Sequence, residues 1–295
     1  MKEVVYVAIA AGAFVALSMW NYRRFMPKPR PLCKPDYEVE IHKLPVQAGE
    51  HTLYGELLLP KGKTGVLPTV ICCHGFGSSY KLCRDTMGKC FAMSGFAVYC
   101  FDFYGGSKHS KSGGNMLEMS IFTEQEDLDA VIDRIKELDC VDAENLFLLG
   151  ESQGGCVAGI TAKRHRDDLK AMVLYYPAFC IPEDAQKKFA SVEEIPAVSK
   201  TFKFEVGKIY NEKLLDYDIF TEIASYDKPV LILHGDMDSV VDISYSRRAA
   251  DCYPNARLEV LPGEPHGFTG KGKRKGAQMS YDFLIEQMQH SNSLQ

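Results

Sequence analysis

The sequence lacks the patterns that mark several common classes of protein. Its ten cysteines form no C-x-x-C pair, which argues against a zinc ribbon or a thioredoxin-like redox site. No repeat of about 20–50 residues and no low-complexity tract occurs. There is no excess of basic charge either, because the formal net charge is −5 over 295 residues, and so no electrostatic footprint for nucleic acid. We therefore expect a globular protein without a metal and without a nucleic-acid partner.

The cysteines that are present lie in apolar surroundings. Cys72, Cys73 and Cys100 fall within strand-like runs, where a thiol behaves as a small hydrophobic side chain. We expect free, buried thiols of the kind found in a reducing compartment, although the sequence leaves a disulfide open.

The N-terminus carries an uncharged apolar run from Val4 to Trp20, which predicts a transmembrane or signal-anchor segment at residues 1–26. Basic residues follow this run, so the positive-inside rule places the rest of the chain in the cytoplasm, as a single-pass membrane protein. A proline-rich linker is expected at residues 27–35. The alternatives are a cleaved signal peptide, which would export the protein, and a buried core helix.

The remainder, residues 36–290, alternates short apolar runs with helical patterns. Eight runs predict strands, the first two antiparallel and the others buried on both faces of a parallel sheet. They are residues 37–41, 53–57, 69–73, 97–103, 145–149, 171–176, 230–233 and 257–261. The clearest helix begins at Thr123, which has a capping-box spacing to Glu126. This order predicts an α/β protein with an eight-stranded, mostly parallel sheet flanked by helices, and a site beyond the carboxyl ends of the strands.

A nucleophile motif follows one of these strands. Residues 150–154 read G-E-S-Q-G and fit the G-x-S-x-G turn, in which a serine lies between a strand and a helix. Glycines are needed there because a Cβ would clash where the helix crosses the strand. We predict Ser152 as a nucleophile for acyl transfer.

Such a serine needs a histidine base, and four histidines lie downstream. His165 is expected on the surface among basic residues, and His290 lies in the terminal tail. His234 precedes the loop that carries the candidate acids Asp236, Asp238 and Asp242, here called the acid loop, and is expected to order it. His266 remains, in a glycine-rich loop after the last strand, and is the predicted base.

The acid that orients the histidine is predicted to be Asp238, because its loop needs a few residues to turn back over the sheet. Asp236 is the alternative. Asp242 better suits the N-cap of the next helix, near residues 244–253. Two backbone N–H groups are expected to stabilise the oxyanion, one from Gln153 and one from Phe76 in the H-G-F-G segment of residues 74–77.

Taken together, these segments resemble the bacterial cinnamoyl and feruloyl esterases of the α/β-hydrolase superfamily, near its serine aminopeptidase-like and monoacylglycerol lipase-like branches. The residues that carry the resemblance are 74–77, 101–103, 119–128, 150–155 and 234–238. It implies the α/β-hydrolase fold, hydrolysis of carboxylic esters through an acyl-enzyme and no cofactor, and it supports Asp238 as the acid. It also implies an inserted lid, here about residues 180–227.

The aromatic residues of this lid either pack it onto the sheet or line an acyl pocket. They are Phe189, Phe202, Phe204, Tyr210 and Tyr217. We predict a serine esterase for a small-molecule ester with a small or aromatic acyl group. The alternatives are a monoacylglycerol lipase or acyl thioesterase, a serine peptidase, and a non-catalytic binding protein. The oligomeric state stays open.

Overall fold

The computed structural model describes residues 30–32 and 37–292, and the predicted membrane segment and most of the linker lie outside them. Within the described residues, no helix combines the length and the apolar character that a membrane span requires. Nine of the ten cysteines are described, and each of these nine is a free thiol. Six of the nine are buried, as expected for thiols that pack as small apolar groups.

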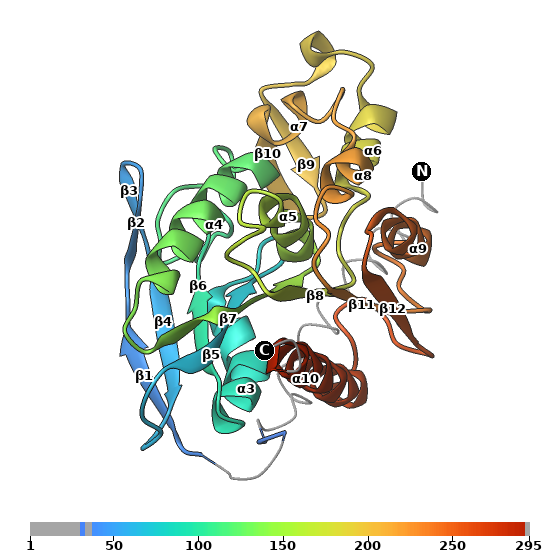
Figure 1. Ribbon diagram of the computed structural model, residues 1–295. Coiled ribbons are helices and arrows are strands. Elements are labelled where there is room, and N and C mark those ends of the chain that lie inside the picture. Colours follow the sequence, from blue (N-terminus) through green and yellow to red (C-terminus); the bar gives the residue numbers. More distant parts are fainter. Residues whose placement is uncertain (1–29, 33–36, 293–295) are drawn as a thin grey trace.

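An eight-stranded sheet organises the chain (Figure 1). Its strand order is β1-β4-β6-β5-β7-β8-β11-β12. The first two pairings, β1 with β4 and β4 with β6, are antiparallel, and all the others are parallel. The strands are β1 Val39–Lys43, β4 Gly55–Pro60, β5 Leu67–Cys73, β6 Ala97–Phe101, β7 Val141–Glu151, β8 Ala171–Tyr175, β11 Val230–Gly235 and β12 Ala256–Leu261. The predicted fold class is confirmed. A short hairpin of β2 Val46–Ala48 and β3 His51–Leu53 is an addition that the apolar runs do not indicate.

Helices cover both faces of the sheet, because successive residues of its central strands point to opposite sides. In β5, Ile71 and Cys73 pack into one core and Val70 and Cys72 into the other. The first core includes α4 Ile121–Lys136, α5 Gln153–Ala162, α8 Ile219–Ile223 and α9 Ile243–Cys252. The second includes α2 Tyr80–Cys83, the π-helical turn η1 Arg84–Gly88, α3 Lys89–Met93 and α10 Gly270–Asn292.

Helix α4 begins two residues earlier than predicted. Ser120 is the N-cap, its hydroxyl accepting from the Thr123 N–H, while the Thr123 hydroxyl accepts from the Ser120 N–H at 2.9 Å. The capping box is therefore formed by Ser120 and Thr123 rather than by Thr123 and Glu126. Glu124 then lies in the first turn of the helix, on its buried face.

The lid lies between β8 and β11 and rises above the carboxyl edge of the sheet (Figure 1). Its described elements are α6 Ile181–Lys188, the 3-10 turn η2 Val192–Glu194, β9 Val198–Thr201, β10 Phe204–Gly207, α7 Ile209–Glu212 and α8. Strands β9 and β10 form an antiparallel hairpin, separate from the main sheet. The hairpin adds no strand to the main sheet. The lid therefore places side chains above the strand ends without changing the order of the strands.

Candidate active site

Ser152 lies at the sharp turn between β7 and α5. Its backbone has φ 54° and ψ −119°, a region that costs a non-glycine residue on the order of 1–3 kcal/mol. The flanking glycines make the turn possible: a Cβ on Gly150 would lie 2.5 Å from the carbonyl oxygen of Gly154, and a Cβ on Gly154 would meet the carbonyl oxygens of Cys73 and His74. The close crossing of helix and strand thus holds the serine hydroxyl at the edge of the sheet.

The structure brings the three residues of the predicted triad together. The Nε2 atom of His266 lies 3.0 Å from the Ser152 Oγ, and its Nδ1 atom lies 2.7 Å from the Asp238 Oδ2. His266 and Asp238 come from loops after β12 and β11, so the histidine reaches the serine, and the aspartate reaches the histidine, from neighbouring strand ends. One ring nitrogen faces a carboxylate and the other a hydroxyl, which is the arrangement a general base requires.

The side chain of Asp238 is fully buried and takes part in several hydrogen bonds. Its Oδ1 accepts from the backbone N–H groups of Val240 and Val241 at 2.8 and 2.9 Å, and its Oδ2 lies 3.2 Å from the His234 Nε2. Burial alone would raise the pKa of this carboxyl, but the hydrogen bonds from His234 and His266 outweigh it and lower the pKa. The group is therefore an anion at neutral pH.

The competing residues of this loop have other contacts. Asp236 accepts from the backbone N–H of Gly263 at 2.6 Å, and Asp242 caps α9 by accepting from the Ser244 N–H at 2.8 Å. His234 contacts the Ser246 hydroxyl at 2.7 Å and the Val241 carbonyl oxygen at 3.0 Å. It therefore ties the acid loop to the sheet, and its contacts are with Ser246, Val241 and Asp238.

The two predicted oxyanion donors belong to segments that lie close to the serine. Gln153 is the first residue of α5, so its N–H has no acceptor within the helix. The loop of residues 74–77 passes close by, since a Cβ on Gly75 would lie 3.1 Å from the Ser152 Cβ. Among the described residues, no backbone carbonyl outside the regular elements accepts from the N–H of Phe76 or of Gln153. Both donors are thus free for a ligand.

A buried histidine supports this loop. The Nδ1 atom of His74 lies 2.9 Å from the carbonyl oxygen of Gly75, and its Nε2 accepts from the Phe103 N–H at 3.3 Å. Burial lowers the pKa of His74, so the ring is neutral, with the proton on Nδ1. The Gly77 N–H donates to the Gly106 carbonyl at 3.0 Å and closes the loop.

A cavity of about 140 Å³ opens beside Ser152 and is lined mostly by the lid. Two of the five lid aromatics, Phe202 and Tyr210, line it. Phe204 packs edge-on against Phe76, with ring centroids 5.5 Å apart. Tyr217 instead packs on Phe122 of α4, at 5.0 Å. The lid aromatics therefore divide between the two expected roles.

Reasoning from the sequence missed Glu124, and it named Tyr210 only as one of five lid aromatics. The side-chain amide of Gln153 donates to Glu124 at 2.8 Å and accepts from the Tyr210 hydroxyl at 2.7 Å. Glu124 is 1% exposed and precedes Leu128 and Val131 by four and seven residues, which places it on the apolar stripe of α4. A glutamate on that stripe is the signal that could have identified it, whereas nothing in the lid sequence indicates the hydrogen bond from Tyr210 to Gln153.

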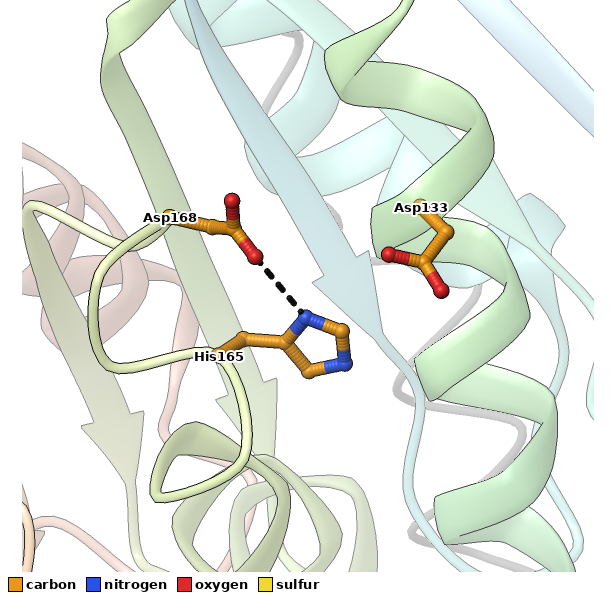
Figure 2. Close-up of side chains that lie close together, drawn as sticks. All are labelled: Asp133, His165 and Asp168. Carbon is orange, nitrogen blue, oxygen red and sulfur yellow. Dashed lines mark hydrogen bonds and ion pairs between the residues drawn. The ribbon is translucent and has the colours of Figure 1, made fainter.

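A second group of titratable side chains lies between α4 and the loop before β8 (Figure 2). His165, expected on the surface, is 8% exposed; its Nδ1 lies 3.2 Å from Asp168 and its Nε2 3.0 Å from Asp129. The prediction of a surface position for His165 was wrong because these carboxylates pack against the ring and shield it from solvent. Asp133 lies close to this group, but the Lys136 ammonium already lies 2.8 Å from Asp133 and 3.1 Å from Asp168. The carboxylates are thus paired with cations of the chain itself.

Comparison with known proteins agrees with the fold described above. Over 99% of the chain and 98% of the relative, the sequence is 26% identical to monoacylglycerol lipase ABHD6 of Bos taurus. The structure of Est1E from Butyrivibrio proteoclasticus with bound ferulic acid is similar at a TM-score of 0.73 and 27% identity, over 83% of this chain and 99% of that one. A monoacylglycerol lipase structure from Paleococcus ferrophilus, at 18% identity and a TM-score of 0.60 over 80% and 99% of the two chains, shares the fold.

The fold and these relatives define a carboxylic ester hydrolase of the α/β-hydrolase class. A family model described as serine aminopeptidase, S33, matches residues 66–216. This is half of the chain, and the chain belongs to that family. The predicted resemblance to feruloyl esterases is confirmed, and the prediction of a serine esterase is confirmed at the level of the enzyme class.

Proposed function

We propose that Ser152 is the nucleophile of an esterase whose substrates carry a small or aromatic acyl group. His266 takes the proton of the serine hydroxyl as Oγ attacks the ester carbonyl carbon, and Asp238 holds the imidazole in the tautomer that accepts it. The N–H groups of Phe76 and Gln153 stabilise the oxyanion. The alcohol leaves with the proton from His266, and water, activated by the same histidine, then releases the acid from the acyl-enzyme.

The hydrogen-bond chain from Asp238 through His266 to Ser152 carries this proposal. The acyl preference is supported by the cavity, whose volume of about 140 Å³ is below the range of about 300–1,000 Å³ that is usual for larger ligands. Its aromatic lining, with Phe76, Phe202 and Tyr210, suits a flat ring. Est1E, whose structure has ferulic acid bound, is a structural relative with an aromatic acid as its ligand.

A first test measures hydrolysis of p-nitrophenyl acetate and butyrate. Ser152→Ala is expected to lower kcat by at least about a thousandfold, because the alanine has no hydroxyl to acylate. Ser225→Ala is the matched control, since this exposed serine at the end of α8 bonds only to the Glu222 carbonyl at 2.6 Å. Turnover by Ser152→Ala at the wild-type rate would exclude the proposed nucleophile.

A second candidate function is the hydrolysis of monoacylglycerols. The similarity to monoacylglycerol lipase ABHD6 over nearly the whole chain favours it, and an anchor at residues 4–20 would hold the site near lipid. Comparing kcat/KM for ethyl ferulate, p-nitrophenyl butyrate, p-nitrophenyl laurate and a long-chain monoacylglycerol separates the two functions. We expect the first two to be preferred, and a preference for the last two would favour the lipase.

A further inference from the structure

The side chain of Gln153 connects the lid to the core of the domain. It is 1% exposed, and both ends of its amide are used. The Nε2 atom donates to the Glu124 Oε2 at 2.8 Å, and the Oε1 atom accepts from the Tyr210 hydroxyl at 2.7 Å. One continuous hydrogen-bonded chain therefore runs from α7 of the lid, through the residue after the nucleophile, to α4.

Tyr210 also contacts the other residue of the proposed oxyanion hole. Its ring centroid lies 5.7 Å from that of Phe76, and its side chain lines the cavity beside Ser152. With 6% of its surface exposed, the tyrosine is held firmly between the two. A single lid residue thus touches the side chains of both residues that are proposed to supply the oxyanion donors.

Glu124 closes the chain on the side of the core. Its Oε1 lies near Gly106, since a Cβ on that glycine would be 3.2 Å away, and the Gly106 carbonyl accepts from the Gly77 N–H in the oxyanion loop. Burial raises the pKa of this carboxyl to about 8, so it is neutral at pH 7. The titratable groups around it, on α4, β5, the loop after β5, α5 and α7, are Asp127, Cys73, His74, Cys156 and Tyr210.

We propose that Tyr210 and Glu124 are positioning residues that fix the Gln153 peptide, so that the lid sets the geometry of the oxyanion hole. This inference rests on the proposed function, because it assigns the Gln153 N–H to the oxyanion. The hydroxyl of Tyr210 donates to the Gln153 side-chain amide from the lid side, and the carboxyl of Glu124 accepts from the same amide on the core side. Loss of either hydrogen bond lets α5 begin in a different orientation, which misdirects a donor that must point accurately.

The first experiment removes one hydroxyl. Tyr210→Phe keeps the ring against Phe76 and in the cavity, so KM is expected to stay within twofold while kcat for p-nitrophenyl butyrate falls about tenfold. Tyr217→Phe is the matched control in the lid, because its ring packs on Phe122, and it should keep the wild-type kcat. Equal kcat values for wild type and Tyr210→Phe would overturn the proposal, as would a loss that falls on KM alone.

The second experiment uses pH. A carboxylate formed at Glu124 would add negative charge beside the developing oxyanion, so kcat of the wild type should fall several-fold as pH rises through about 8. Glu124→Gln still accepts from Gln153 but cannot ionise, so its kcat should show no such decline as pH rises. An unchanged alkaline limb in Glu124→Gln would overturn the role of this carboxyl.

Labelling with a fluorophosphonate distinguishes failure of this inference from failure of the proposed esterase function on which it rests. If the wild-type chain fails to label at Ser152, the proposed nucleophile is wrong. If the wild type labels and Tyr210→Phe labels at the same rate, the nucleophile stands and the positioning chain does not. We expect labelling of both, about tenfold slower in Tyr210→Phe, with melting temperatures that show both proteins to be folded.

Discussion

His266 and His165 lie in two regions of the molecule and each contacts an aspartate, yet they are suited to different tasks. At the active site, one nitrogen of His266 faces Asp238 and the other faces the neutral hydroxyl of Ser152. Between α4 and β8, both nitrogens of His165 face carboxylates. A ring that donates from both nitrogens is an imidazolium, which has no lone pair to act as a base. The second partner, rather than the aspartate, decides which histidine can accept a proton.

The largest expected effect comes from removing the carboxylate that contacts His266. Asp238→Asn should lower kcat about 10⁴-fold, because the amide favours the tautomer of His266 that cannot accept the serine proton. Asp236→Asn is the matched control two residues away, and should stay within about threefold of wild type because that side chain caps the Gly263 N–H. Steady-state kinetics with p-nitrophenyl butyrate measures both, and a greater loss in Asp236→Asn would make Asp236 the acid.

A smaller effect is expected at the second histidine, on stability and not on kcat. Burial alone would lower the pKa of His165, but hydrogen bonds to Asp129 and Asp168 outweigh it and raise the pKa. His165→Gln should lose about 1–2 kcal/mol of unfolding free energy at pH 6. Since the folded pKa is raised, this contribution is complete below the unfolded value of about 6.5 and is lost as pH rises through the folded one.

Urea unfolding at pH 6 and pH 9 tests that sign. The difference between wild type and His165→Gln should be larger at pH 6, and kcat should match wild type at pH 7. A difference that grows toward pH 9 would mean that the ring is neutral in the folded state.

The smallest effect concerns the edge of the same cluster. Arg164 is half exposed and pairs with Asp129 at 2.5 Å. Arg164→Ala should change the unfolding free energy by less than about 1 kcal/mol, because solvent screens an exposed ion pair. Chemical denaturation measures it. A loss as large as that of His165→Gln would show that the arginine, and not the buried ring, holds Asp129.

The strands and the order of the site residues could be predicted because they depend on local patterns. Residues 70–73 and 146–149 are apolar throughout, as a strand buried on both faces must be. Gly150 and Gly154 mark the turn because any side chain there meets backbone. Ser152, Asp238 and His266 then follow in the chain order of the fold, and the structure brings them within hydrogen-bonding distance.

What could not be predicted depends on partners that are distant in the sequence. His165 has basic neighbours in the chain, but Asp129, 36 residues away, takes part in its burial. The contact between Tyr210 and Gln153 spans 57 residues and exists only once the lid is seated. In the same way, the hydroxyl that caps α4 is that of Ser120, because the preceding loop turns there and not at Thr123. Residues 1–26 lie outside the described chain, so the predicted anchor stays a prediction.

The lid is contained within one crossover between β8 and β11, two strands that are hydrogen-bonded neighbours in the sheet. Residues can therefore be inserted, deleted or exchanged in this crossover without moving either strand or the serine turn on β7. Evolution could then vary the acyl group that is accepted while retaining the hydrolytic machinery. The hydrogen bond from Tyr210 to Gln153 sets one condition on such exchange: a replacement lid must supply its own donor to that amide, which makes this contact the first junction to preserve when lids are recombined between relatives.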